Sequence, residues 1–153
     1  KWYAIKVFQN KTAPLESLFK TDNVRYFIPS SVISSLAFVL ESESYITELQ
    51  ETQYRSLWFY KDKGSKKPTP IPDREMEMFI FVATAGSKGL LFLGDDRLEY
   101  HIGNRVRVKD GPFKGAEGHI KRIKKDRRLI VSIHGVAAIA TSYIHPDFLE
   151  IID

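Results

Sequence analysis

The chain contains no cysteine among its 153 residues, which excludes disulfide bonds and thiolate chemistry. This absence fits a reducing compartment, and we expect the protein to be cytoplasmic. No apolar run approaches the ~20 residues that a membrane-spanning helix needs, and no signal-peptide pattern is present. We therefore expect no membrane partner. Because the sequence opens on Lys1 rather than Met, we also expect a trimmed or processed chain.

Patterns that carry catalysis or hold a metal are also missing. The four histidines, His101, His119, His134 and His145, show no H-x-x-x-H spacing, and no cysteine completes a zinc set. No G-x-x-x-x-G-K-[ST] phosphate loop is present. Acidic pairs such as Asp95-Asp96 are more often helix caps or solvated turns than cation sites. The sequence therefore predicts a protein that is not an enzyme and has no metal and no cofactor.

Positive charge is concentrated in the last third of the chain. The net charge is +4, and residues 99–153 carry ten Lys and Arg against seven Asp and Glu, whereas residues 1–98 carry thirteen against twelve. The bases are densest between Lys114 and Arg128. Such a cluster is either a footprint for nucleic acid or a hairpin tip kept soluble by its charge. The candidate nucleic-acid contacts within it are Lys121, Arg122, Lys124, Lys125 and Arg127.

Residues 1–83 alternate between predicted strands and helices. Aromatic and β-branched runs predict strands at 2–8, 24–28, 35–40 and 57–60. Helical spacing predicts helices that begin near residues 14, 45 and 74, the last after an Asp73 cap. The four large residues 57–60 cannot all face one side, so a second apolar face is expected to be available to a partner. This order is typical of an α+β domain built on an antiparallel sheet.

Residues 84–100 are rich in glycine and aspartate and are predicted to be a linker. Leu90–Leu93 within it is too apolar for a free tether, so we expect this short run to pack on something. Beyond the linker only strands are predicted, and they form a small five-stranded barrel over residues 101–153. The strands are expected at 105–109, 116–124, 128–134, 136–142 and 148–152.

The first of these strands leads into a distinctive turn. Valines alternate with basic residues, Asp110-Gly111-Pro112 then stops the strand, and a glycine at 118 would let two backbones approach closely. The spacing V-x-V-x-x-G-P-F-x-G-x-x-G resembles the KOW motif of NusG-type transcription elongation factors and of some ribosomal proteins. The matching positions are Val106, Val108, Gly111, Pro112, Phe113, Gly115 and Gly118.

The resemblance extends over the whole chain. The W-Y-A-I-K-V opening is similar to the start of NusG amino-terminal domains. Residues 35–39 lie where that family has a G-Y-x-F-V-like strand, and 68–72 resemble its P-x-P-[IL] segment. The domain order is that of NusG and its paralogue RfaH, with an SH3-like KOW barrel at the end. The segment 71–77, together with a shortened loop before Leu36, looks most like the UpxY-type antiterminators of capsule loci in Bacteroides relatives.

This resemblance implies a monomeric elongation or antitermination factor that binds RNA polymerase and suppresses pausing or termination. Its amino-terminal domain would bind the polymerase clamp helices through an apolar groove lined by Leu36, Phe38 and Tyr60. Gln50, Gln53 and Arg55 would contact single-stranded DNA. The family's Gly-Tyr is replaced here by Ser35-Leu36, which makes the aromatic lining weaker.

Further partners implied for the KOW domain are nascent RNA, Rho or a ribosomal protein. Two other interpretations stay open at this point. The chain would be a KOW-type RNA-binding or ribosome-associated protein if the basic cluster binds phosphates. An enzyme of unknown type is the weakest alternative, because no set of catalytic groups converges.

Overall fold

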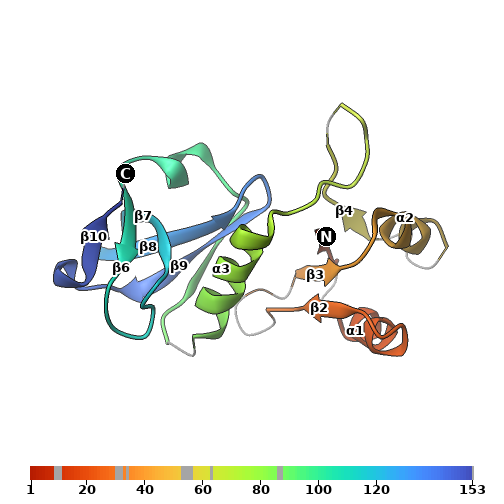
Figure 1. Ribbon diagram of the computed structural model, residues 1–153, viewed down its shortest axis with the longest axis horizontal. Helices are drawn as coiled ribbons and strands as arrows, with labels where there is room; N and C mark the ends of the chain where they lie inside the picture. Colours follow the sequence, from red (N-terminus) through yellow and green to blue (C-terminus); the bar gives the residue numbers. More distant parts are fainter. Residues whose placement is uncertain are drawn as a thin grey trace. The chain divides into compact units, whose positions relative to one another are not determined.

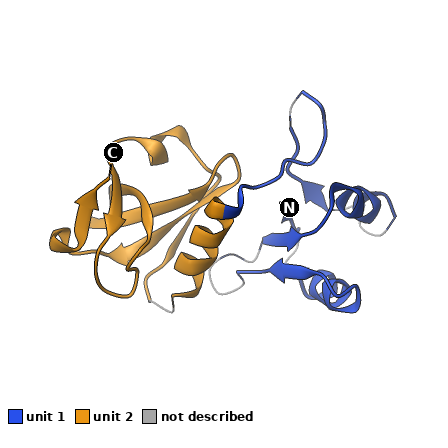
Figure 2. Ribbon diagram, in the orientation of Figure 1, with its two compact units in different colours: residues 1–73 blue, residues 74–153 orange. Residues whose placement is uncertain are grey.

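The computed structural model describes residues 1–8, 12–29, 33, 35–52, 57–62, 64–85 and 88–152. These residues form two compact units, 1–73 and 74–153 (Figure 2). Each unit contains one antiparallel sheet. The α+β class predicted from the sequence is confirmed. No helix within the described ranges is long and apolar enough to cross a membrane.

The first unit is a four-stranded sheet with two helices (Figure 1). Its strands run in the order β2-β3-β1-β4, and each neighbouring pair is antiparallel. In chain order its elements are β1 (Trp2–Lys6), α1 (Thr12–Thr21), β2 (Arg25–Phe27), β3 (Leu36–Leu40), α2 (Glu43–Thr52) and β4 (Trp58–Phe59).

One face of this sheet is covered by α1 and α2. Tyr3 and Ile5 on β1 pack in one core with Phe19 of α1 and Ile46 of α2. The helical spacing of apolar residues in the two helices produces this arrangement, because it collects them on one side of each helix. Helix α2 begins after Ser42, whose Oγ accepts a hydrogen bond from the Tyr45 backbone N–H at 3.2 Å, as an N-cap does.

The second unit combines a helix with a six-stranded sheet that curls into a small barrel (Figure 1). The strand order is β10-β6-β7-β8-β9-β5. Its helices are α3 (Asp73–Thr84) and the short 3₁₀ helices η1 (Leu98–His101) and η2 (Pro146–Phe148). Its strands are β5 (Leu91–Gly94), β6 (Arg105–Val108), β7 (Glu117–Ile123), β8 (Asp126–Ile133), β9 (Ala137–Tyr143) and β10 (Leu149–Ile151).

The five predicted barrel strands correspond to β6–β10, and β5 is a sixth strand within the predicted linker. β5 pairs with β9, and its Leu91 and Leu93 pack on a buried cluster that includes Tyr100 and Ile130. The expectation that Leu90–Leu93 packs is therefore confirmed. The predicted domain boundaries, 1–83, 84–100 and 101–153, remain a prediction about independently folding parts.

The KOW turn has the backbone that its residue types favour. Gly111 and Gly115 take φ values of +86° and +94°, which glycine adopts without strain. Between them Phe113 turns inward and is 3% exposed, and Val106 and Val108 are buried. At Gly118 a Cβ would overlap with the carbonyl oxygen of Ile130 on the neighbouring strand, so this position tolerates only glycine.

Candidate functional site

One face of the first sheet carries all three residues predicted to bind RNA polymerase. Phe38 is paired with Ala4, and the Tyr60 N–H donates to the Ala4 carbonyl at 3.4 Å. Leu36 is paired with Lys6, which is in turn paired with Trp58. Residues paired across a sheet point to the same side, so these side chains share the face opposite α1 and α2. We call this face, defined by Leu36, Phe38, Trp58 and Tyr60, the aromatic face.

Exposure on the aromatic face is confined to its β4 edge. Phe38 and Leu36 are 0% and 2% exposed, and Phe27 stacks on Phe38 with 6.4 Å between ring centroids. Trp58 is 48% exposed, and its ring lies edge-on to Tyr60 at 4.5 Å. A partner therefore meets Trp58 first, and the binding role of Leu36, Phe38 and Tyr60 stays a prediction.

A hollow of about 220 Å³ lies beside Trp58. Gln50, at the end of α2, lines it together with Lys61 and Lys66. The Asp62 carboxylate also lines the hollow, so its two amines are partly offset; an exposed indole beside amines and an amide is suited to base stacking and phosphate pairing with a single strand. Gln53 and Arg55, the other two predicted contacts, lie outside the residues that the structure describes.

The turn that carries these lysines is held by Asp62. Its carboxylate accepts hydrogen bonds from the Ser65 backbone N–H at 2.8 Å and from the Ser65 hydroxyl at 3.0 Å. These bonds favour the charged form and lower the pKa of the Asp62 carboxyl below its ordinary value. The turn is thereby fixed at neutral pH with both lysines exposed.

The outer surface of α2 carries the opposite charge. Glu48 and Glu51 are exposed, and Glu48 also lines a second hollow with Asp22 and Glu41. Carboxylates at this density repel a phosphate backbone. Any nucleic-acid contact in the first unit is therefore favoured at the Trp58 hollow and disfavoured along the helix.

The predicted basic cluster forms the β7–β8 hairpin. Lys124 and Lys125 make its tip, with φ values of +53° and +72°. Arg122 and Arg127 are paired directly across the two strands, and both are exposed. Lys121 forms an ion pair with Glu99 at 3.5 Å, so its charge is partly compensated. We call Arg122, Lys124, Lys125 and Arg127 the basic hairpin.

Arg128 follows the basic hairpin in sequence but does not belong to its surface. It is 9% exposed, and its guanidinium donates to the carbonyls of Gly89 at 2.9 Å and Thr141 at 3.0 Å. A third bond reaches the Ile123 carbonyl at 3.3 Å. This arginine fastens the chain before β5 to the sheet.

Comparison with known proteins agrees with this architecture. Residues 102–134 match the KOW motif. A solved structure of NusG from Thermotoga maritima, reported for its domain interaction, matches with a TM-score of 0.52 and covers 100% of this chain and 97% of its own at 19% identity. The chain has a NusG-like fold with a KOW motif. A comparison with curated proteins finds no significant match.

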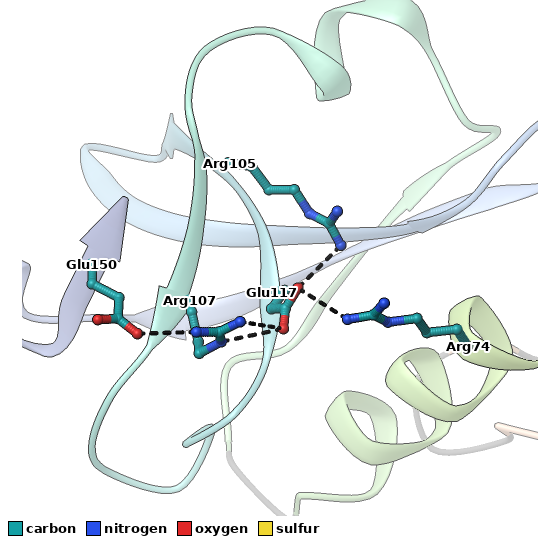
Figure 3. A network of polar contacts seen from close by, with 5 residues as sticks. All are labelled: Arg74, Arg105, Arg107, Glu117 and Glu150. Carbon is teal, nitrogen blue, oxygen red and sulfur yellow. Dashed lines mark hydrogen bonds and ion pairs between the residues drawn. The ribbon is translucent and has the colours of Figure 1, made fainter. Parts of the chain in front are cut away.

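In this NusG-like fold, a carboxylate neutralises the basic face of β6. Glu117 is 9% exposed and lies 3.2 Å from guanidinium nitrogens of both Arg105 and Arg107 (Figure 3). Arg107 also donates to Glu150 at 3.3 Å, and Arg74 approaches Glu117 at 3.9 Å. The hydrogen bonds to Glu117 and then to Glu150 raise the pKa of Arg107. These arginines are engaged within the unit, whereas the basic hairpin gathers four exposed bases at one place among the described residues of the KOW region.

Two groups at candidate sites were not predicted from the NusG-like sequence. Lys61 and Lys66 next to Trp58 lie in a charged loop that gave no signal beyond its composition. Asp96, His101 and His134 have ligand atoms within 4.8 Å of one another, although 33 residues separate the two histidines. Sequence spacing reveals metal sets only when the ligands come from one helix or one tight loop, so this group had no recognisable pattern.

Proposed function

We propose that this chain is a NusG-type transcription elongation or antitermination factor, which binds RNA polymerase through its amino-terminal part and suppresses pausing or termination. The observation that carries the proposal is the correspondence with a NusG structure along the whole chain, joined to the KOW motif at the expected place. The fold alone does not specify function. The aromatic face, with an exposed tryptophan at its edge, supplies the site.

In this proposal the aromatic face binds the clamp helices of the polymerase. The exposed part of this face is its Trp58 edge, where an aromatic side chain suits an amphipathic helix because it excludes water from the contact, while Leu36 and Phe38 are buried. The Trp58 hollow, with Gln50 and two lysines, lies beside this face and would contact the displaced DNA strand. A factor that binds the clamp helices and the displaced DNA strand at the same time would disfavour pauses in which the clamp and the DNA move apart.

We predict that purified protein co-migrates with bacterial RNA polymerase core enzyme and shortens pauses in single-round transcription. Trp58→Ala should weaken polymerase binding more than about tenfold, since Trp58 is the large exposed aromatic side chain of this face and truncation of an aromatic anchor commonly has such an effect. Binding is measured by titrating fluorescently labelled polymerase, and pausing by transcript length against time.

Phe92→Ala is the matched control for this prediction. Phe92 is 39% exposed but lies on β5, in the other unit, so its loss should leave polymerase binding unchanged. The proposal is wrong if the wild-type protein neither binds core enzyme nor alters pausing. Equal losses in the two variants would show that the aromatic face is not the binding surface.

A second candidate function, RNA binding by the KOW region, is favoured by the basic hairpin. Arg122 and Arg127 face each other as like charges, an arrangement that is unfavourable by up to about 1 kcal/mol in an antiparallel pair. An anionic partner would remove this repulsion. Nascent RNA is such a partner. A protein partner of the KOW region, Rho or a ribosomal protein, is proposed on the family resemblance alone.

We predict that the double variant Arg122→Gln, Arg127→Gln binds single-stranded RNA more weakly and less steeply with salt. Loss of two phosphate contacts should reduce the slope of log K against log [salt] by about 1.4, at about 0.7 for each contact to a single strand. The same variant should unfold at a slightly higher urea concentration, because the like-charge pair is gone. Filter binding at several salt concentrations and urea unfolding measure the two effects.

The opposite signs of these two effects make the test specific. A variant that binds weakly because it is misfolded would be less stable, not more. Lys109→Gln is the control, since Lys109 is exposed beyond β6 and outside the hairpin. If the double variant keeps the wild-type salt slope, the basic hairpin is a solubilising tip and the RNA-binding function is excluded for it.

The narrower assignment to the UpxY-type antiterminators is proposed on the sequence resemblance at residues 71–77. In the structure, Ile71 is buried and forms an isolated antiparallel β-bridge with Trp2. Helix α3 begins two residues later. A locus-specific factor would change the promoter-distal transcripts of one operon when its gene is deleted. A general factor would change pausing across many transcription units.

A further inference from the structure

Three of the four histidines in the sequence gather at one place in the second unit. The ring of His101 lies 5.8 Å from that of His134 and 6.1 Å from that of His119, centroid to centroid. The carboxylate of Asp96 lies among them with its side chain 5% exposed. These residues come from the segment after β5, from β7 and from the β8–β9 turn, so the fold and not local sequence brings them together.

The ligand atoms of three of these residues are close enough to share one ion. His101 Nε2 lies 2.9 and 3.0 Å from the two oxygens of Asp96, and His134 Nδ1 lies 3.9 Å from Asp96 Oδ2. The three ligand atoms are all within 4.8 Å of one another. Ligands of a tetrahedral zinc ion, each about 2.0–2.2 Å from the metal, are separated by about 3.4 Å. Small side-chain rotations reach this spacing, because His134 is 83% exposed and free to adjust.

We propose that Asp96, His101 and His134 form a binding site for a divalent transition-metal ion of the Zn²⁺ type. Two imidazoles and one carboxylate suit zinc and its neighbours, whereas Mg²⁺ and Ca²⁺ prefer oxygen ligands throughout. With three protein ligands, a water molecule completes the tetrahedron. The ion would tie the segment between β5 and β6 to the β8–β9 turn.

Hydrogen bonds from neighbouring groups hold Asp96 and the turn that carries His134 in place. The Gly135 backbone N–H donates to Asp96 Oδ2 at 3.0 Å, which fixes one carboxylate oxygen. The Ser132 hydroxyl lies 3.4 Å from His101 Nε2, the atom that would bind the ion, so this contact would give way to the metal and does not orient the ligand. At His134 the backbone N–H donates to Glu75 at 2.8 Å, so the turn that carries this ligand is itself held in place. Such bonds outside the ligand shell position metal ligands in known sites.

A simpler role for Asp96, as a cap of the turn at Gly135, explains one of these contacts but not the others. A cap needs a carboxylate oxygen and a backbone N–H, and it gives no reason for two imidazoles to converge on the same oxygens. His119 is anchored separately, with Nδ1 3.2 Å from the Gly103 carbonyl, and does not belong to the three-residue set. The two roles predict different behaviour when zinc is added.

Isothermal titration of the full chain with zinc chloride tests the proposal. One ion should bind per chain, and the urea midpoint of unfolding should rise with zinc concentration, since an ion that binds only the folded state stabilises it. Asp96→Asn keeps the size of the side chain and an oxygen that accepts from Gly135, but it removes the charge. Asp96→Asn and His134→Gln should each weaken zinc binding by at least about 100-fold. Loss of a residue that only orients a ligand usually costs about 10–100-fold, and loss of a ligand itself should cost more.

His145→Gln is the matched control, because His145 is an exposed histidine near Asp147 and away from the cluster. Its zinc affinity should equal that of the wild type. A second measurement needs no variant: in NMR spectra of the wild-type protein, one equivalent of zinc should shift the ring signals of His101 and His134 and leave those of His145 in place. The proposal is overturned if zinc moves all the histidine signals alike, or if Asp96→Asn binds zinc as the wild type does.

Discussion

Gly118→Ala is expected to lower the unfolding free energy of the KOW barrel by at least about 3 kcal/mol, the upper end of the usual range for overpacking. The added methyl group would overlap with the Ile130 carbonyl oxygen on β8, and a backbone atom cannot move aside by changing rotamer. The β7 and β8 strands would have to separate at this point, which disrupts the pairing between His119 and Ile130.

The control for this prediction comes from the same motif. Gly115 also has a positive φ, but no atom lies within 4 Å of the position of its missing Cβ. Gly115→Ala should therefore lose only about 1–2 kcal/mol, the strain of a left-handed alanine. Equal losses in the two variants would show that backbone conformation, and not the close approach of β7 to β8, explains the glycine at 118.

The probe for this measurement has to be chosen with care. Both tryptophans, Trp2 and Trp58, lie in the first unit, so their fluorescence does not report on the barrel. Methyl NMR signals of Ile130 and Ile133, both buried in β8, follow the barrel directly during urea unfolding. Unchanged tryptophan fluorescence in Gly118→Ala would confine the damage to the second unit.

Local sequence was sufficient for most of the fold. The alternation of Val106 and Val108 with arginines, and the Gly-Pro turn that follows, predict β6 and the KOW turn because both depend on neighbouring residues only. The helical spacing of α1 and α2 predicted their buried faces for the same reason. The strand β5 appeared as a linker, since a run of four apolar residues between glycines gains its stability from pairing with β9, some 45 residues later.

The solvent exposure of side chains at the candidate sites was harder to predict from the sequence than the place of these residues in the fold. The family resemblance predicted Phe38 and Tyr60 on one face, but whether that face is open depends on what packs against it. Arg128 shows the same limit. It belongs to a run of bases, yet the register shifts between Arg128 and Ile130, where β8 pairs with β9. Such an irregularity redirects side chains and leaves no mark in the sequence.

Arg128→Met is expected to destabilise the barrel by about 1–3 kcal/mol. Methionine retains most of the length and the apolar stem of the side chain but removes every donor. The buried Thr141 carbonyl then loses its hydrogen bond from the guanidinium, and a buried acceptor left without a donor costs about 1–3 kcal/mol, whereas the carbonyl of Gly89, an exposed residue, can bond to water instead. Because Gly89 precedes β5, this edge strand should be the first part to open, as faster amide exchange at Leu91–Gly94.

Arg127→Met is the matched control, at the adjacent position and with the same change of side chain. Arg127 is exposed on the basic hairpin, so its loss should change the unfolding free energy by no more than about 0.5 kcal/mol. The same variant should weaken RNA binding if the hairpin contacts phosphates, whereas Arg128→Met should leave the salt slope unchanged under conditions where it is folded. The two variants would thus show that Arg128 contributes to the stability of the barrel and that Arg127 contributes to its RNA binding. Equal stability losses in the two variants would contradict the structural role assigned to Arg128.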